Sequence, residues 1–260
     1  FGPLVMVGAF MLLLTRGLAG APDLGALYAV PLAIAAIALP AAAFGWAMSS
    51  GIYRRLEGRP LAAMIAAIGL AIAIAEAVRL LQGPQTQWLP FRPDAILQLG
   101  SVDGFAVVAS LRHLAIGAAT ALLAAGLYLV GRHTRRGRAF RASVEDGRMA
   151  ALLGVDGPRL IAGVFALGGL LAGLAGAFAA WHYGPVDFRM GMPLGFKALT
   201  AAVVGGLGSV PGAFLGGIAV AVVEIAAAAA IGGAWRDVIV FGLLAAMLVL
   251  RPRGIAGARE

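Results

Sequence analysis

The chain has 260 residues, of which 61% are hydrophobic and 12% are charged, and its formal net charge is +8. Soluble domains are about half apolar and a quarter charged, so this composition excludes an ordinary soluble protein and indicates an integral membrane protein. Membrane topology then explains the basic excess, and we expect no nucleic-acid partner. The sequence contains no cysteine, which excludes disulfides and thiolate metal sites, and its three scattered histidines indicate no metal cluster.

Apolar segments recur along the first half at lengths that suit membrane helices, which need about 20 residues. They lie at 2–14, 26–48, 61–81 and 113–130. Pro31 and Pro40 fall inside the second segment, where we expect a kinked and packed helix. The polar excursion at 82–112 is long enough to contain small helices of its own. The chain opens inside an apolar run without an initiator methionine, so we expect an N-terminal helix to be missing.

The second half contains full or nearly full apolar segments at 160–181, 213–231 and 238–250, together with one unusual segment. Residues 194–204 are too few to span, and they lead into GGLGSVPG at 205–212. A broken segment is tolerated at membrane depth only where protein or a wet cavity surrounds it, so 194–212 is a candidate pathway wall. The predicted fold is an all-α bundle of about seven spans, including this segment, in one transmembrane domain over 1–260.

Arginines are concentrated in the loops on one side of this arrangement. Short cytoplasmic loops carry an excess of basic residues, which places 49–60, 131–159 and the tail in the cytoplasm and 82–112 outside. The cytoplasmic side then holds thirteen arginines against six elsewhere, namely Arg54, Arg55, Arg59, Arg132, Arg135, Arg136, Arg138, Arg141, Arg148, Arg159, Arg251, Arg253 and Arg259.

The stretch 137–156, GRAFRASVEDGRMAALLGVD, is the most polar part of the cytoplasmic side. Four charged residues recur at helical spacing and would share one helix face: Arg138, Arg141, Glu145 and Arg148. Gly154 favours a helix end, and Asp156 followed by Pro158 favours a new helix start. We therefore predict one short amphipathic helix outside the bilayer, in a loop over 132–158. The simpler alternative is a loop whose arginines only set topology.

A few ionisable residues lie within the apolar segments, where charge is costly and faces the bundle interior or water. Glu76 and Arg79 are three residues apart and can pair. Glu224 lacks a partner in its own segment, which leaves a pathway role and a structural hydrogen bond equally open. Lys197 can contact polar substrate groups or extend to the surface, and the second is favoured. The candidate pathway residues are Lys197, Gly205, Gly206, Gly208, Glu224 and Glu76.

The glycine-rich sequences favour close helix packing over nucleotide binding. Residues 205–212 lack the Gly-Lys-Ser/Thr ending of a phosphate loop. Gly212 with Gly216, and Gly169 with Gly173, have the spacing that lets membrane helices approach closely. There is also no nucleophile–base pair at a recognisable spacing, so we expect no enzyme and no cofactor in this chain. If ATP drives a process here, another subunit must bind it.

From residue 137 to 257 the sequence resembles the LivH-type permeases of branched-chain amino acid ABC importers. The matching pieces are GRAFRA (137–142), AALLGV (150–155), FALGGLLAGLAGAF (165–178), GFKALTAAVVGGLGSVPGAFLGG (195–217) and WRDVIVFGLLAAMLVLRPRGIAG (235–257). FGPLVMVGA at the start resembles the family's first-helix region. Family members often carry Glu-Ala-Ala where this chain has Arg148, Met149 and Ala150.

The resemblance implies a permease subunit in the bacterial inner membrane that moves branched-chain or other hydrophobic amino acids by ATP-driven alternating access. It implies two ABC ATPase subunits, a second permease subunit, expected to be a relative, and a periplasmic binding protein. ATPase coupling falls on Arg138, Arg141, Arg148, Ala150, Ala151 and Gly154. Two alternatives remain: the same scaffold with urea, short amides or other small solutes as cargo, and an ion-coupled secondary transporter using Glu76 or Glu224. The broken segment argues against a non-transporting scaffold.

Overall fold

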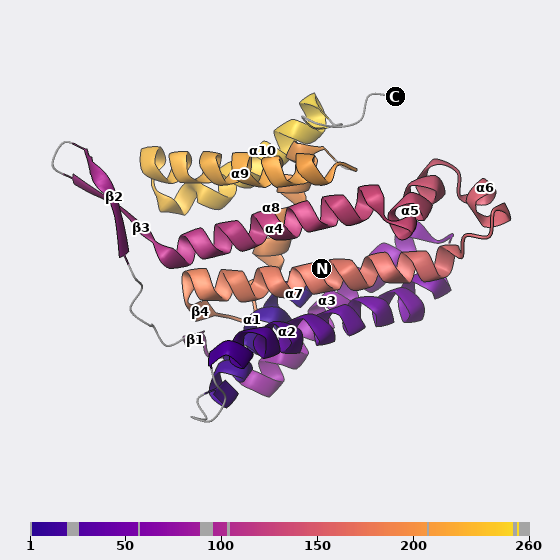
Figure 1. The fold of residues 1–260 in the computed structure, drawn as a ribbon, viewed down its shortest axis with the longest axis horizontal. Helices are drawn as coiled ribbons and strands as arrows, with labels where there is room; N and C mark the ends of the chain where they lie inside the picture. The colour runs from indigo at the N-terminus through magenta and orange to yellow at the C-terminus, as the bar shows by residue number, and fades with distance from the viewer. Residues whose placement is uncertain are drawn as a thin grey trace. The chain divides into compact units, whose positions relative to one another are not determined.

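The computed structural model describes residues 2–19, 26–56, 58–88, 96–102, 105–206, 208–251 and 254. Helices make up most of this part (Figure 1). The α-helices are α1 (Gly2–Ala19), α2 (Ala26–Met48), α3 (Pro60–Gln82), α4 (Leu111–His133), α5 (Arg135–Glu145), α6 (Gly147–Leu152), α7 (Gly157–Tyr183), α8 (Gly191–Gly205), α9 (Val210–Ile231) and α10 (Arg236–Leu250). The other elements are the π-helical turn η1 (Ser49–Tyr53), the 3-10 turns η2 (Arg54–Leu56) and η3 (Gly233–Trp235), and strands β1 (Gln87–Trp88), β2 (Ile96–Val102), β3 (Phe105–Ser110) and β4 (Pro185–Val186).

Six helical segments in the described residues are long and apolar enough to cross a membrane. They are 34–56, α3, α4, α7, α9 and 233–250, and two shorter apolar helices occupy 2–15 and α8. The predicted all-α membrane bundle is therefore confirmed. The 15 residues of α8 reach about 22 Å at a rise of about 1.5 Å per residue, which is short of a hydrocarbon core of about 30 Å.

The chain divides into two compact units. The first comprises Phe1–Ala119 and Arg135–Met192, and the second comprises Thr120–Thr134 and Pro193–Glu260.

In the first unit, α7 packs closely against both α1 and α2 because small residues line the contacts. A Cβ added at Gly169 would lie 2.3 Å from the carbonyl oxygen of Ala41 in α2. One added at Gly176 would lie 1.7 Å from the carbonyl oxygen of Val5 in α1. The small-residue ridge predicted around Gly169 is thus a real helix contact, and it allows backbone-to-backbone approach.

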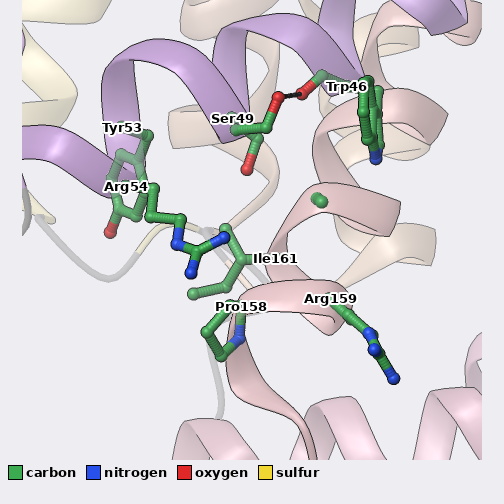
Figure 2. A pocket seen from close by; sticks show the side chains of 9 residues that line it. Trp46, Ser49, Tyr53, Arg54, Pro158, Arg159 and Ile161 are labelled. Atoms are coloured by element: carbon green, nitrogen blue, oxygen red, sulfur yellow. Dashed lines mark hydrogen bonds between the residues drawn. The ribbon is translucent and has the colours of Figure 1, made fainter.

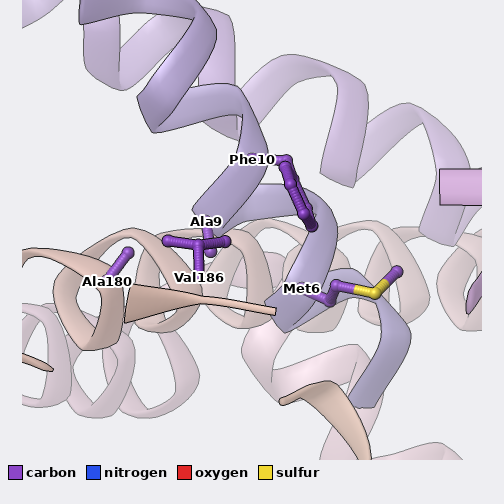
Figure 3. Close-up of a cluster of buried hydrophobic side chains, with 5 residues drawn as sticks. All are labelled: Met6, Ala9, Phe10, Ala180 and Val186. Atoms are coloured by element: carbon purple, nitrogen blue, oxygen red, sulfur yellow. The ribbon is translucent and has the colours of Figure 1, made fainter. Parts of the chain in front are cut away.

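A buried apolar cluster closes one end of the contact between α1 and α7 (Figure 3). It combines side chains from α1, the last turn of α7 and strand β4: Met6, Ala9, Phe10, Ala180 and Val186. Strand β4 also pairs with β1, so the residues that follow α3 and those that follow α7 meet at the same end of this unit. The arginine distribution agrees with this pairing. It places 82–112 outside, and the segment 160–181, which starts in the cytoplasm, ends on the same outer side.

The excursion 82–112 differs from the expectation of small helices. In its described part, β2 and β3 form an antiparallel pair with a register shift between Gln98 and Gly100, and β3 runs directly into α4. β3 (FAVVAS) contains two valines and a phenylalanine, and β2 (ILQLGSV) begins with isoleucine and ends with valine, residue types that favour strands. Asp103–Gly104 between them is a typical hairpin dipeptide, although these two residues and 89–95 lie outside the described residues.

In the second unit, α8 and α9 approach each other closely at several glycines, and α10 packs on α9. A Cβ added at Gly205 would lie 2.0 Å from the carbonyl oxygen of Gly212, and one added at Gly216 would lie 2.2 Å from that of Ala201. The turn places Gly206 and Gly208 at φ +104° and +100°, a region that glycine adopts without strain. The expected small-residue packing of Gly212 and Gly216 is therefore confirmed.

Candidate coupling and translocation sites

The predicted coupling stretch is two helices at an angle, so the expectation of one helix was wrong. Helix α5 ends at Glu145, and the Asp146 carboxylate then caps α6 by accepting hydrogen bonds from the backbone N–H groups of Arg148 and Met149, at 2.9 and 3.0 Å. Asp146 has an extended backbone conformation, which breaks the helix at that residue. The Asp-Gly sequence was the signal for this break.

The end of the coupling stretch follows the prediction. Gly154 has φ +86°, the left-handed conformation that ends a helix. The Asp156 carboxylate accepts a hydrogen bond from the backbone N–H of Arg159 at 3.1 Å, and Pro158 lies in the first turn of α7. These two features fix the path of the chain from α6 into the membrane helix α7.

The coupling stretch exposes a mixed basic and apolar surface. Arg138, Arg141, Arg148 and Ala151 are exposed, whereas Ala150 is buried. Sequence reasoning missed the apolar part of the surface: Met149, Leu152 and Leu153 are all exposed, and Leu152 is 82% exposed. Large apolar side chains outside a bilayer, clustered on one short helix, are typical of a surface that another protein covers.

Lys197 is the centre of a charged cluster in the second unit. Its Nζ lies 2.8 Å from Glu224 Oε1 and 3.0 Å from Asp237 Oδ1, and Arg236 Nε lies 3.8 Å from the same Glu224 oxygen. The side chains of Lys197 and Glu224 are only 22% and 16% exposed. Lys197 therefore does not simply extend to the surface, as the sequence favoured, and Glu224 has a structural partner.

Glu76 and Arg79 pair with each other, as their spacing predicts. Arg79 Nε donates to Glu76 Oε1 at 2.8 Å, and both side chains are substantially exposed. Both carboxylates suggested as proton sites thus carry basic partners, which does not favour the ion-coupled alternative.

Comparison with known proteins decides the family. The family described as "Branched-chain amino acid transport system / permease component" matches residues 1–248. The chain belongs to this family. It is a multi-pass permease component of the inner (plasma) membrane and not an ATPase, and it is one part of a larger transport system.

Several curated relatives resemble the permease over most of its length. The high-affinity branched-chain amino acid transport system permease protein BraD of Pseudomonas aeruginosa is 36% identical over 100% of this chain and 85% of its own. LivH of Salmonella typhimurium is 36% identical over 85% of this chain and 72% of its own. The autoinducer 2 import system permease protein LsrC of Klebsiella pneumoniae is 33% identical over 64% of this chain and 49% of its own. No solved structure matches the permease significantly.

Proposed function

We propose that the permease moves branched-chain or other hydrophobic amino acids across the inner membrane as the translocation subunit of an ABC importer. The similarity to BraD over the whole chain carries this proposal, because that relative is named for high-affinity branched-chain amino acid transport. Closure of partner ATPases on ATP would move the coupling stretch, and the attached spans would alternate access to a central site.

The proposed partners are two ABC ATPase subunits, a second permease subunit related to this one, and a periplasmic substrate-binding protein. The coupling stretch supports an ATPase contact because it joins exposed arginines to the exposed apolar side chains of α6 between two membrane helices. We assign this contact to Arg138, Arg141, Arg148, Ala151 and Gly154, with Ala150 packed beneath them.

The pathway is proposed to run along the broken α8–α9 segment. Lys197, Glu224 and the glycines of the 205–208 turn (Gly205, Gly206 and Gly208) belong to this segment, while Glu76 lies in α3 of the other unit. Because Lys197 and Glu224 pair with each other, we propose that they shape the wall of the pathway and that any substrate contact requires the pair to open.

One observation supports an alternative cargo. A relative at 33% identity is named for autoinducer 2 import, so chains with this sequence pattern are associated with more than one solute. Urea, short amides or another small polar solute therefore remain the alternative cargo on the same scaffold. The binding protein would make most of the selection in either case.

Uptake in proteoliposomes tests the proposal. The full complex is reconstituted with its binding protein. Uptake of radiolabelled leucine is then measured with ATP on the side of the membrane that the ATPase subunits face. We expect uptake that needs ATP and persists when the proton gradient is collapsed. Uptake of leucine without ATP that disappears with the gradient would overturn the importer proposal. ATP-driven uptake of another solute but not of leucine would contradict the proposed cargo.

Gly154→Val tests the coupling assignment in the same assay. A β-branched residue at φ +86° is strained by roughly 1–3 kcal/mol, so the path from α6 to α7 must change. We expect ATP hydrolysis to continue while leucine uptake falls severalfold. Gly147→Val is the matched control, because Gly147 starts α6 with open space around it and lacks a left-handed φ. Equal uptake in the two variants would count against the assignment.

A further inference from the structure

A cavity of about 290 Å³ lies in the first unit, between the end of α2 and the start of α7 (Figure 2). Trp46, Ser49 and Arg54 line it from α2 and the turns η1 and η2, and Arg159 and Ile161 line it from α7. Neither the coupling surface of α6 nor the α8–α9 segment contributes to it. The π-helical turn at its wall is a rare form that occurs frequently at functional sites.

Ser49 is a buried polar residue in the wall of the cavity. The residue is only 3% exposed, lines the cavity, and its hydroxyl has no hydrogen-bond partner among the described residues. The neighbouring Ser50 hydroxyl, in contrast, donates to the backbone carbonyl of Trp46 at 3.0 Å. A hydroxyl that opens into a cavity can bond to a group that enters it, so Ser49 offers a hydrogen-bonding position to a ligand there.

The rim of the cavity is positively charged. The Arg54 side chain extends toward Pro158 and Ile161 on the opposite helix (Figure 2) and forms no ion pair within the described part of the chain. Arg159 Nε contacts Asp156 Oδ2 at 3.0 Å, which offsets one of the two positive charges. The N-terminus of the 27-residue α7 adds positive partial charge at the same place. An anionic ligand group is therefore favoured at the rim.

The polarity of the lining changes with depth in the membrane. The arginine distribution places Arg54 and Arg159 at the cytoplasmic surface. Trp46 precedes Arg54 by eight residues, which is about 12 Å deeper at a helical rise. Trp46 and Tyr53 are both substantially exposed, and such aromatic side chains prefer the membrane interface. The cavity thus offers charge at the surface, a hydroxyl below it, and apolar surface at membrane depth.

We propose that this cavity binds an anionic phospholipid of the cytoplasmic leaflet through its phosphate group. Arg54 and Arg159 bind the phosphate oxygens, the Ser49 hydroxyl donates to the phosphate or to an ester oxygen of the glycerol, and an acyl chain packs along Trp46. Basic pockets between membrane helices on the cytoplasmic side recognise lipid headgroups in this way. The lipid would thereby bridge α2 and α7 at the point where the coupling stretch enters the membrane.

Fluorescence quenching of Trp46 tests the proposal in the full-length permease with its accompanying subunits. The complex is placed in phosphatidylcholine nanodiscs that contain a fixed small fraction of brominated phosphatidylglycerol or brominated phosphatidylcholine. The signal that disappears in a Trp46→Phe variant isolates the response of Trp46. We expect the anionic lipid to be preferred at Trp46 by at least about fivefold, since one basic side chain near a membrane surface contributes about that factor.

Variants separate the cavity from the general surface charge. Arg54→Gln is expected to remove most of the preference and Ser49→Ala to lower it by roughly threefold, while Arg54→Lys retains part of it and confirms that the fold tolerates changes there. Arg55→Gln is the matched control, because Arg55 is adjacent and exposed but does not line the cavity.

Three outcomes would overturn the proposal. The first is equal quenching of Trp46 by the two brominated lipids. The second is the same loss of preference in Arg55→Gln as in Arg54→Gln, which would assign the effect to diffuse surface charge. The third is removal of the preference by inorganic phosphate at constant ionic strength, which would replace the lipid by a soluble phosphate as the occupant.

Discussion

Replacing Lys197 with methionine is expected to destabilise the second unit, because one ammonium group faces two carboxylates. Removing it leaves Glu224, which is 16% exposed, and the remaining basic group close to its Oε1 among the described residues is Arg236 Nε at 3.8 Å. Breaking a fully buried pair costs about 3–5 kcal/mol, and exposed pairs contribute about 0–1 kcal/mol. Glu224 is mostly buried and Asp237 is 58% exposed, so we expect a loss of about 2 kcal/mol in the free energy of unfolding.

Thermal unfolding in detergent, followed by tryptophan fluorescence, measures this effect. A loss of about 2 kcal/mol corresponds to a Tm lowered by roughly 4–8 °C for a chain of this size. The double variant Lys197→Met/Glu224→Gln should be about 1 kcal/mol more stable than Lys197→Met alone, because no carboxylate is left uncompensated. Asp237→Asn is the control and should cost less than about 1 kcal/mol. An unchanged Tm in Lys197→Met, or strictly additive single effects, would refute the reasoning.

Further predictions concern packing and capping. Gly176→Ala should lower the free energy of unfolding by about 1–3 kcal/mol, because its Cβ would lie 1.7 Å from the Val5 carbonyl oxygen. Gly163→Ala is the control, since Gly163 lies in open space on the same helix, and it should be neutral or slightly stabilising in the same unfolding assay. Asp146→Ala removes the cap of α6 and should cost about 1 kcal/mol locally, which hydrogen exchange would report as severalfold faster exchange in the first turn of α6. Unchanged exchange there would show that the cap is dispensable.

The elements that the sequence predicted well depend on local patterns. The membrane helices follow from apolar runs of sufficient length, and their bounds in the structure differ from the expectation by a few residues. The end at Gly154 and the restart at Asp156 follow from glycine conformation and side-chain capping, which need only neighbouring residues. The Glu76–Arg79 pair could be predicted from the sequence because both residues lie on one helix at a fixed spacing.

The features that the sequence did not predict depend on residues distant along the chain or on competing local signals. Lys197 and Glu224 are 27 residues apart on different helices, and only the tight packing of α8 on α9 brings them together. The rings of His113 and His182 likewise lie 4.8 Å apart between their centroids, although the sequence shows them as scattered. At Asp146, helical charge spacing favoured one continuous helix, but an Asp-Gly cap prevailed.

Cross-linking from α6 tests the central claim that this segment couples the permease to an ATPase. The sequence contains no cysteine, so Leu152→Cys introduces a single labelling site in this chain on the exposed apolar surface. A photoreactive maleimide attached there should cross-link to an ABC ATPase subunit in native membranes, with an efficiency that changes when ATP is added. The same label at Leu80→Cys, on the exposed outer part of α3, should not. An ATPase cross-linked equally from both positions, or from neither, would contradict the account.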